Sequence, residues 1–155
     1  MDTHSQIKLQ VRRAVYSDAF NLWSIRNHSL VRKFSFNKKI IKFTDHKKWL
    51  EQFLKQNNNL LYILEKRSLP GHEWNSIGYC RYAFLVDKYL VSIAIHPDSW
   101  NKGFATYLLR ETLNLVRLSG KTIYAEIIPD NKMSLHLFLK NKFVEDSFLK
   151  DRIIL

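Results

Sequence analysis

Apolar residues along the first sixty positions recur at two different spacings, and each spacing predicts a different element. Over residues 6–15 every second position tends to be apolar, which predicts a first strand. Ser17–Asp18 is typical of a helix start, and residues 28–39 predict a short second helix or turn. The clearest helix follows, with Thr44 or Asp45 expected as its cap. The expected buried positions of the first and the last of these helices are Phe20, Trp23 and Ile25, then Trp49, Leu50, Phe53 and Leu54.

The second half of the chain begins with three strand-like runs and then alternates between helices and strands. The predicted elements are strands at 60–68, 76–85 and 89–97, a helix at about 104–119, a strand at 122–130, a helix at 132–142 and a pair of strands within 143–155. The resulting order is β-α-α-β-β-β-α-β-α-β-β. Strands mixed with helices at this density indicate an α/β or α+β domain built on one mixed sheet.

Length and composition indicate one ordinary folded domain over residues 1–155. The chain is 46% apolar and 14% aromatic, which is enough for a sizeable core. Cys80 is its one cysteine, so no internal disulfide framework is expected and the reducing cytoplasm is the expected location. The six histidines and the cysteine show no metal-ligand spacing, and we expect no metal. No apolar run is long enough to span a bilayer, and the first fifteen residues lack the apolar core of a signal peptide.

The charge balance narrows the class of partner. Lysine and arginine number 25 against 14 acidic residues, which gives a net charge of +11. Such a charge favours an anionic partner, whether nucleic acid, a membrane surface or a phosphorylated small molecule. The basic residues are spread along the chain and do not cluster, and the aromatic residues fall at core-like spacing. Both patterns weaken the interpretation as a nucleic-acid binder.

The stretch "HPDSWNKGFATYLL" at 96–109 carries the strongest local signal for chemistry. It leads from a predicted strand into a predicted helix through Gly103, one of only four glycines. The start of a helix presents unpaired N–H groups and the positive end of the dipole, and together these bind phosphate groups. Lys102 adds charge, and Ala105 keeps the next position small. Neither a Walker loop nor a GxGxxG motif is present, and an ordinary strand-to-helix turn remains the alternative.

Two motifs in their context of strands and helices resemble the Gcn5-related N-acetyltransferases, the GNAT family. That family has Q/R-x-x-G-x-G/A where this chain has Trp100, Gly103 and Ala105 in "WNKGFA". The second motif is matched by Asn131, Ser134, Phe138 and Phe143, with Lys142 where glycine is usual. The resemblance implies a single GNAT-fold domain, with a mixed central sheet of about seven strands and helices on both faces.

The resemblance also implies acetyl-CoA as a co-substrate. Backbone amides of the fourth strand would orient it, the loop at 101–106 would hold its pyrophosphate, and Phe138 would lie against the thioester. Asn131 and Ser134 would lie near the pantetheine or adenylate arm. The cofactor-binding residues expected on this basis are Ile93, Ala94, Ile95, Asn101, Lys102, Gly103, Phe104, Ala105, Thr106, Asn131, Ser134 and Phe138.

Two positions depart from the family pattern in the residues that move protons. Phe138 replaces the tyrosine that usually acts as the acid, and Leu90 stands where a glutamate base is frequent. The substitute catalytic candidates are Ser92, His96 and Tyr124. A loop or capping role for His96 and a place on the sheet face for Tyr124 are the structural alternatives.

The helices expected over the acceptor resemble a narrower group. "LWSIRNHSLVRKFSF" and "FTDHKKWLEQFL" resemble bacterial transferases that acetylate an amino-sugar nucleotide in nonulosonic acid synthesis. The implied substrate-binding residues are Arg26, Asn27, Arg32 and Arg81. Guanidinium groups form charge-assisted pairs with a diphosphate, and an asparagine can read a sugar hydroxyl. His46 and Trp49 also match the group's pattern, although helix packing is the preferred interpretation of both.

Other functions remain open from the sequence. Acetyltransferases that act on the N-terminal amine of ribosomal proteins share the "RN…VR" opening, so a protein or peptide α-amine is the second candidate acceptor. An acidic acceptor cleft would favour the peptide, and a basic one would favour the nucleotide sugar. A CoA-binding module without catalysis is a third possibility. A monomer or a homodimer is expected.

Overall fold

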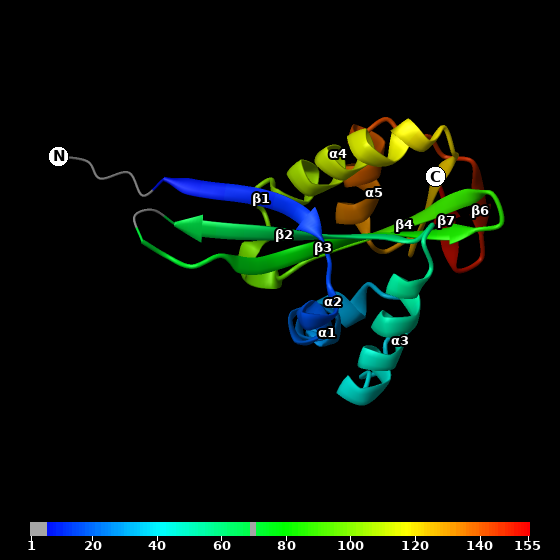
Figure 1. Ribbon diagram of the computed structural model, residues 1–155. Coiled ribbons are helices and arrows are strands. Elements are labelled where there is room, and N and C mark those ends of the chain that lie inside the picture. Colours follow the sequence, from blue (N-terminus) through cyan, green and yellow to red (C-terminus); the bar gives the residue numbers. More distant parts are fainter. Residues whose placement is uncertain (1–5, 69–70) are drawn as a thin grey trace.

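A computed structural model describes residues 6–68 and 71–155 (Figure 1). The strands are β1 (Ile7–Arg13), β2 (Leu60–Ser68), β3 (Asn75–Leu85), β4 (Lys88–Ile95), β5 (Ile123–Ile127), β6 (Ser147–Leu149) and β7 (Arg152–Ile154). The helices are α1 (Ala19–Asn27), α2 (Ser29–Lys33), α3 (Phe43–Lys55), α4 (Phe104–Val116) and α5 (Lys132–Lys140). Three short 3₁₀ turns complete them, at η1 (Tyr16–Asp18), η2 (Pro97–Ser99) and η3 (Arg117–Ser119).

All these strands join one seven-stranded mixed sheet in the order β1-β2-β3-β4-β5-β7-β6. The first four strands form an antiparallel meander, and only the β4–β5 pair is parallel. The helices α1, α2 and α3 lie on one face of the sheet, and α4 and α5 cover the other (Figure 1). The fold class expected from the sequence is therefore confirmed.

The alternation of side chains along β2 explains how one sheet supports two cores. Leu61 and Ile63 belong to the core beneath α1 and α3, whereas Tyr62 and Leu64 belong to the core beneath α4. Successive side chains of a strand point to opposite faces, so a strand that is covered on both sides is apolar at every position. The run "LLYIL" at 60–64 follows this rule.

Several local expectations were wrong. α3 begins at Phe43 with Lys42 as its cap residue, and no side chain caps it, because Thr44 and Asp45 already lie inside the first turn. Phe20 is 59% exposed and does not enter the core. Its ring instead joins a surface cluster, 5.7 Å from the Trp23 ring and 6.0 Å from the Phe43 ring. Trp49 and Leu54 are half-buried but pack against the core as expected, whereas the strand expected at 122–130 ends at residue 127.

The helix α5 ends in a Schellman motif built on a lysine. Lys142 has a φ of +69°, in the left-handed region that glycine usually occupies. Its N–H donates to Leu139 O at 3.1 Å, and the Phe143 N–H donates to Phe138 O at 3.1 Å. The Phe138 and Phe143 rings then meet edge to face, with centroids 5.0 Å apart. The motif forms although its preferred residue is missing.

We therefore expect Lys142→Gly to stabilise the protein by about 1 kcal/mol, because it removes the steric cost of the left-handed conformation. Urea unfolding followed by circular dichroism measures the change. The matched control is Lys140→Gly, which places glycine inside the last turn of α5 and should destabilise by about 1 kcal/mol. A lower unfolding midpoint for Lys142→Gly than for the wild type would contradict the expected relief of strain.

Candidate active site

A cleft opens where β4 and β5 separate. The two strands pair only from Tyr89 to Val91 with Ile123 to Ala125. Beyond that point β4 remains paired with β3 as far as Ile95, whereas β5 turns away to pair with β7. The cleft has a volume of about 870 Å³ and is lined from both faces of the sheet. Its walls come from α1, the loop after α2, α3, the ends of β3 to β5, and the starts of α4 and α5.

The open edge of β4 presents backbone groups to this cleft. The Tyr89 N–H donates to Thr122 O on the β5 side at 2.9 Å, and the His96 N–H donates to Ile77 O on the β3 side at 2.7 Å. Because strand amides alternate, those of Ile93 and Ile95 face the open side. The Trp100 indole Nε1 donates to Ile95 O at 2.7 Å and so occupies that carbonyl. The amides of Ile93 and Ile95 and the carbonyl of Ile93 therefore face the gap.

The glycine turn lies at the mouth of the same cleft. Gly103 has a φ of +78° and is the cap residue of α4, with no side-chain cap. The first helical bond of α4 runs from Tyr107 N to Gly103 O, so the amides of residues 104–106 have no partner within the helix. A Cβ atom added to Gly103 would meet no other atom within 4 Å, so the constraint on this residue is its φ angle and not local crowding. Lys102 does not line the cleft, and its Nζ donates to Asp98 O at 2.9 Å.

The second motif lies across the cleft from the glycine turn, at the start of α5. Asn131 caps that helix, with its Oδ1 accepting from Ser134 N at 3.1 Å and its Nδ2 donating to Ser134 Oγ at 2.9 Å. Phe138 lines the cleft one helical turn further on and is only 3% exposed. The structure therefore brings Asn131, Ser134 and Phe138 together with the glycine turn and the open edge of β4.

Three basic side chains line the other end of the cleft, on the face of α1 and α3. They are Arg26 from α1, His46 from α3 and Arg81 from β3. Each has a buried nitrogen, respectively Nη1, Nε2 and Nε, with no hydrogen-bond partner among the residues that the structure describes. Buried polar groups are rarely left unpaired, because each costs about 1–3 kcal/mol. The cleft therefore contains three of the four buried side-chain nitrogens that have no partner among the described residues, the fourth being Arg67 Nε.

Neighbouring groups hold these side chains in place. Arg81 Nη2 donates to the Ser92 hydroxyl at 3.2 Å, and its guanidinium lies 5.6 Å from the Trp49 ring centroid. The His46 and Trp49 rings are 5.3 Å apart. Arg26 Nη2 donates to Asn37 O at 2.8 Å. One nitrogen each of Arg26 and Arg81 is thus held by a hydrogen bond, and the His46 ring is held by packing. The Nη1 of Arg26, the Nε2 of His46 and the Nε of Arg81 have no described partner.

Burial and mutual repulsion shift the protonation of this cluster. Burial lowers the pKa of His46, and the charge of Arg26 lowers it further, so the imidazole is uncharged at neutral pH. Burial also lowers the pKa of Arg81, again with a contribution from Arg26. Burial raises the pKa of the Tyr79 hydroxyl, which lines the same wall and stays protonated. The wall therefore carries positive charge that its own side chains do not neutralise.

Several candidates from the sequence do not line the cleft. His96 Nδ1 accepts from Asp98 N at 3.2 Å, so its ring caps η2. Tyr124 lies outside the cleft, with Lys88 Nζ 4.9 Å from its ring centroid. Asn27 exchanges two hydrogen bonds with the Ile41 backbone, at 2.7 and 3.0 Å. Arg32 donates to Asn27 O at 2.9 Å and Lys38 O at 3.0 Å. Ser92, Arg26 and Arg81 are the catalytic and substrate candidates that do line it.

Other cleft residues were missed or judged differently from the sequence. His46 and Trp49 were assigned to packing, yet both line the cleft, and their i, i+3 spacing on one helix was the available signal. Asp45, Tyr79, Glu126 and His136 also line it and were not singled out. Glu126 is paired with Arg152, with Nη1 to Oε2 at 2.6 Å. Arg152 comes from the far end of the chain, so no sequence pattern indicated this pairing.

The mixed sheet thus separates at its parallel pair, and the glycine turn lies at the opening of the resulting cleft. The sequence matches the family model of the acetyltransferase (GNAT) domain over residues 8–144. The chain belongs to the GNAT family and is an acetyl-CoA-dependent N-acetyltransferase of that type.

Solved structures share this fold at low sequence identity. Spermidine N-acetyltransferase from Vibrio cholerae, solved with CoA and spermine, is 18% identical with a TM-score of 0.78, over 95% of this chain and 94% of that one. Ribosomal-protein-alanine N-acetyltransferase from Brucella melitensis is 19% identical with a TM-score of 0.76, over 94% and 96%. A domain from Methanocaldococcus jannaschii is 19% identical with a TM-score of 0.81, over 97% and 99%. No curated protein sequence matches the chain.

The described residues hold neither a membrane-spanning helix nor a metal-binding cluster of acidic, histidine and cysteine side chains. Within 6–68 and 71–155, no helix combines the length and apolarity needed to cross a membrane. In the same ranges no group of three or more histidine, cysteine, aspartate or glutamate side chains is placed to hold a metal ion.

Proposed function

We propose that the enzyme transfers the acetyl group of acetyl-CoA to the primary amine of a nucleotide-linked amino sugar. The observation that carries this proposal is the basic wall of Arg26, His46 and Arg81, with its unpaired buried nitrogens. A diphosphate offers several anionic oxygens, and guanidinium groups bind such oxygens through charge-assisted hydrogen bonds. An anionic acceptor would complete the hydrogen bonds that the chain leaves open.

The other end of the cleft suits acetyl-CoA. The free amides at residues 104–106 and the positive end of the α4 dipole would bind the pyrophosphate. The Ile93 N–H and C=O would bind the pantetheine arm as a neighbouring strand would, and thereby orient the thioester toward Ser92 and Arg81. Asn131 and Ser134 would flank the same arm, with Phe138 against the acetyl group.

Catalysis would then depend mainly on positioning. The amine nitrogen attacks the thioester carbon, the C–S bond breaks, and the CoA thiolate departs, so that the acetyl group stays on the nitrogen as an amide. Phe138 has no proton to donate, and Leu90 cannot accept one. Water in the open cleft would therefore carry the amine proton away, and holding the two reactants together would supply much of the rate.

The charge of the cleft disfavours the alternative acceptors. A peptide α-amine or a polyamine is cationic at neutral pH and binds best beside free carboxylates. Among the described lining residues Glu126 is paired with Arg152, which leaves Asp45 on α3 as the one free carboxylate against the two guanidinium groups of Arg26 and Arg81. The wall nearest the open edge of β4 is basic.

A thiol-release assay with acetyl-CoA tests the proposal on UDP-linked amino sugars, short peptides and spermidine. We expect turnover on the nucleotide sugars, with a KM that rises about tenfold or more in Arg81→Gln because that variant loses a charge-assisted contact. The matched control is Arg67→Gln. Arg67 also has a buried Nε with no partner among residues 6–68 and 71–155 and lies 4.7 Å from an aromatic centroid, that of Trp74, but it does not line the cleft.

The control should retain the wild-type KM. Turnover on peptides or spermidine but not on any nucleotide sugar would overturn the acceptor assignment while leaving the acetyltransferase in place.

A further inference from the structure

The loop between α2 and α3 forms part of the cleft wall and is held by contacts on two sides. We refer to residues 34–41 as the crossing loop; Phe34, Ser35, Phe36, Asn37 and Ile41 from it line the cleft. Polar contacts from α1 and α2 hold one side. Asn37 O accepts from Arg26, Lys38 O accepts from Arg32, and Ile41 O accepts from the Trp23 indole at 2.7 Å. These contacts come from α1 and α2, the two helices that directly precede the crossing loop in the chain.

On the other side, a side chain from the C-terminal strands contacts the crossing loop. The Arg152 guanidinium of β7 lies 4.4 Å from the centroid of the Phe36 ring. The two residues are far apart in the sequence, and only Phe36 lines the cleft. Their contact joins the crossing loop to β7.

Arg152 uses two parts of its guanidinium at once. Its nitrogens pair with Glu126 at 2.6 Å and with Asp151 at 2.8 Å, while the ring of Phe36 lies close to its Cζ. A planar guanidinium can pair along its edge and stack on its face at the same time, whereas a lysine ammonium is a point charge that cannot do both equally well. The ion pair between Arg152 and Glu126 also neutralises the Glu126 carboxylate, which lines the cleft.

We propose that Arg152 is a positioning residue for the acceptor, acting through the crossing loop. It contacts Phe36, and the adjoining Asn37 carbonyl accepts from Arg26, a cleft residue whose Nη1 is buried without a described partner. Loss of Arg152 would free the crossing loop from β7 and release the Glu126 carboxylate into the cleft. Both effects would weaken the binding of an anionic acceptor. The inference that this acceptor is anionic rests on the proposed function, whereas the closure of the loop does not.

The contact between Arg152 and Phe36 is partly exposed and therefore weak. Phe36 is 45% exposed, and the Arg152 side chain is 29% exposed. Cation–π contacts and ion pairs at such sites each contribute only modestly. Loss of the contact with Arg152 would therefore loosen one side of the crossing loop, while the hydrogen bonds from α1 and α2 still hold the other.

Limited proteolysis tests the closure without any substrate. Lys38 and Lys39 lie in the crossing loop and are exposed, so trypsin can cut there whenever the loop leaves the surface. We expect Arg152→Ala and Phe36→Ala to be cut after these lysines about two- to fivefold faster than the wild type, as loss of one exposed cation–π contact implies. The cleavage after Lys121, in the loop before β5, serves as the internal reference.

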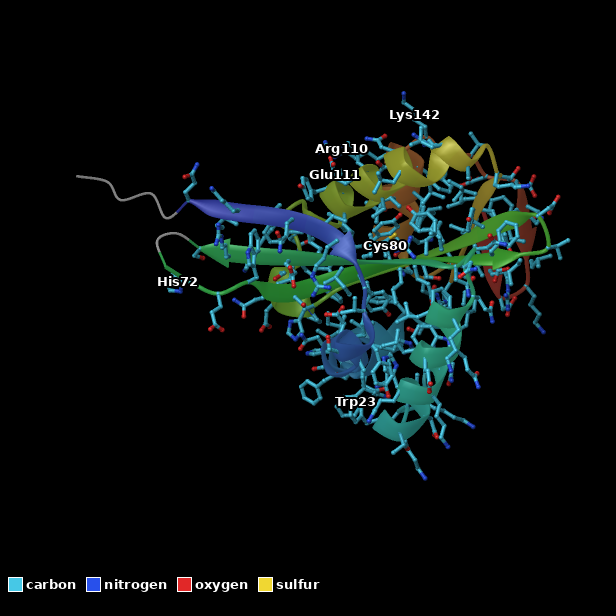
Figure 2. The ribbon with its side chains drawn as sticks, in the orientation of Figure 1. Trp23, His72, Cys80, Arg110, Glu111 and Lys142 are labelled. Atoms are coloured by element: carbon cyan, nitrogen blue, oxygen red, sulfur yellow. The ribbon has the colours of Figure 1, made fainter. Side chains whose placement is uncertain are left out.

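The chain offers a matched control on the opposite face of the sheet. Arg110 of α4 likewise pairs with a carboxylate, that of Glu111 at 3.6 Å, and lies 5.8 Å from the ring of Tyr107. Figure 2 shows Arg110 and Glu111 on the α4 side, away from the helices α1 to α3. Arg110→Ala should leave the cleavage after Lys38 and Lys39 at the wild-type rate. Arg152→Lys, which keeps the charge, should be cut at an intermediate rate.

Binding of UDP, measured calorimetrically with the CoA site saturated, gives the second readout. We expect its Kd to rise about tenfold in Arg152→Ala, and to recover in part when Glu126→Gln is added and removes the freed carboxylate. Unchanged cleavage after Lys38 and Lys39 in Arg152→Ala, or equal acceleration in Arg110→Ala, would overturn the role of Arg152. If the wild type binds no UDP while the cleavage pattern is as expected, the acceptor class has failed and the closure stands.

Discussion

Replacing Gly103 by glutamate is expected to abolish acetyl-CoA binding, with a Kd raised at least about a hundredfold. Gly103 precedes the free amides of α4, where the pyrophosphate is proposed to bind. A glutamate there would place a carboxylate beside that anion and could occupy the same amides. A hundredfold change corresponds to about 2.7 kcal/mol, a size that one like charge at close range can supply. Calorimetric titration with acetyl-CoA measures the effect.

Gly120→Glu is the control for backbone strain. Gly120 has a φ of +69°, and a Cβ atom added there, as at Gly103, would have no neighbour within 4 Å. Gly120 lies after η3, however, and does not line the cleft. Both variants should therefore lose similar stability in urea, and only Gly103→Glu should lose the ligand. Wild-type affinity in a folded Gly103→Glu protein would refute the placement of the pyrophosphate.

Arg12→Ala is expected to destabilise the protein by about 3 kcal/mol, because two nearly buried carboxylates lose their charged partner while other donors and water at the 35% exposed Arg12 position replace it only in part. Arg12 pairs with Asp18 at 2.7 Å and with Glu65 at 2.8 Å, and these side chains are only 7% and 9% exposed. The network ties β1 to η1 and to β2. Denaturant unfolding of Arg12→Ala beside Arg13→Ala measures the effect, because Arg13 is exposed and donates only a long bond, at 3.4 Å, to Asn59 O. Equal losses in the two variants would contradict the role of the network.

The same network predicts how acid destabilises the protein. Burial would raise the pKa of Asp18, but hydrogen bonds from Arg12 and from the Val15 N–H outweigh it and hold that pKa below its ordinary value. A carboxyl with a lowered folded pKa contributes stability above its unfolded pKa, and that contribution is lost as the pH falls through the folded pKa. The acid transition of Arg12→Ala should therefore begin at a higher pH than that of the wild type.

The sequence predicted the order of elements because that order follows from local periodicity. Strands such as 60–68 and the helix after Gly103 have clear spacing and matched the structure within a few residues. Errors arose where contacts between distant segments determine the burial of a side chain or the start of a helix. Phe20 has the spacing of a core residue but lies at the surface against other aromatic rings, and the cap expected at Thr44 or Asp45 was displaced by an earlier helix start.

The candidate site also has parts that the sequence could predict and parts that it could not. The glycine turn and the second motif could be found from the sequence because each is a continuous stretch whose residues act together. The basic wall combines α1, α3 and β3, and only the partners of each side chain show which atoms remain free. Asn27 and Arg32 have the residue types of a sugar and phosphate site, yet both are committed to backbone groups. No spacing could have distinguished them from Arg26.

The short pairing of β4 with β5 also affects how firmly the two parts of the sheet are joined. β1 to β4 form a meander of sequence neighbours, whereas β5 joins them through only three residue pairs, from Tyr89 to Val91. Segments with few ladder bonds open first in partial unfolding, and segments rich in local contacts form early. The C-terminal strands thus join the meander through few ladder bonds, and packing of Ala125, Ile127 and Ile153 into the common core supplies much of the connection. A ligand that contacts both β4 and α5 would add a staple between these two parts of the sheet.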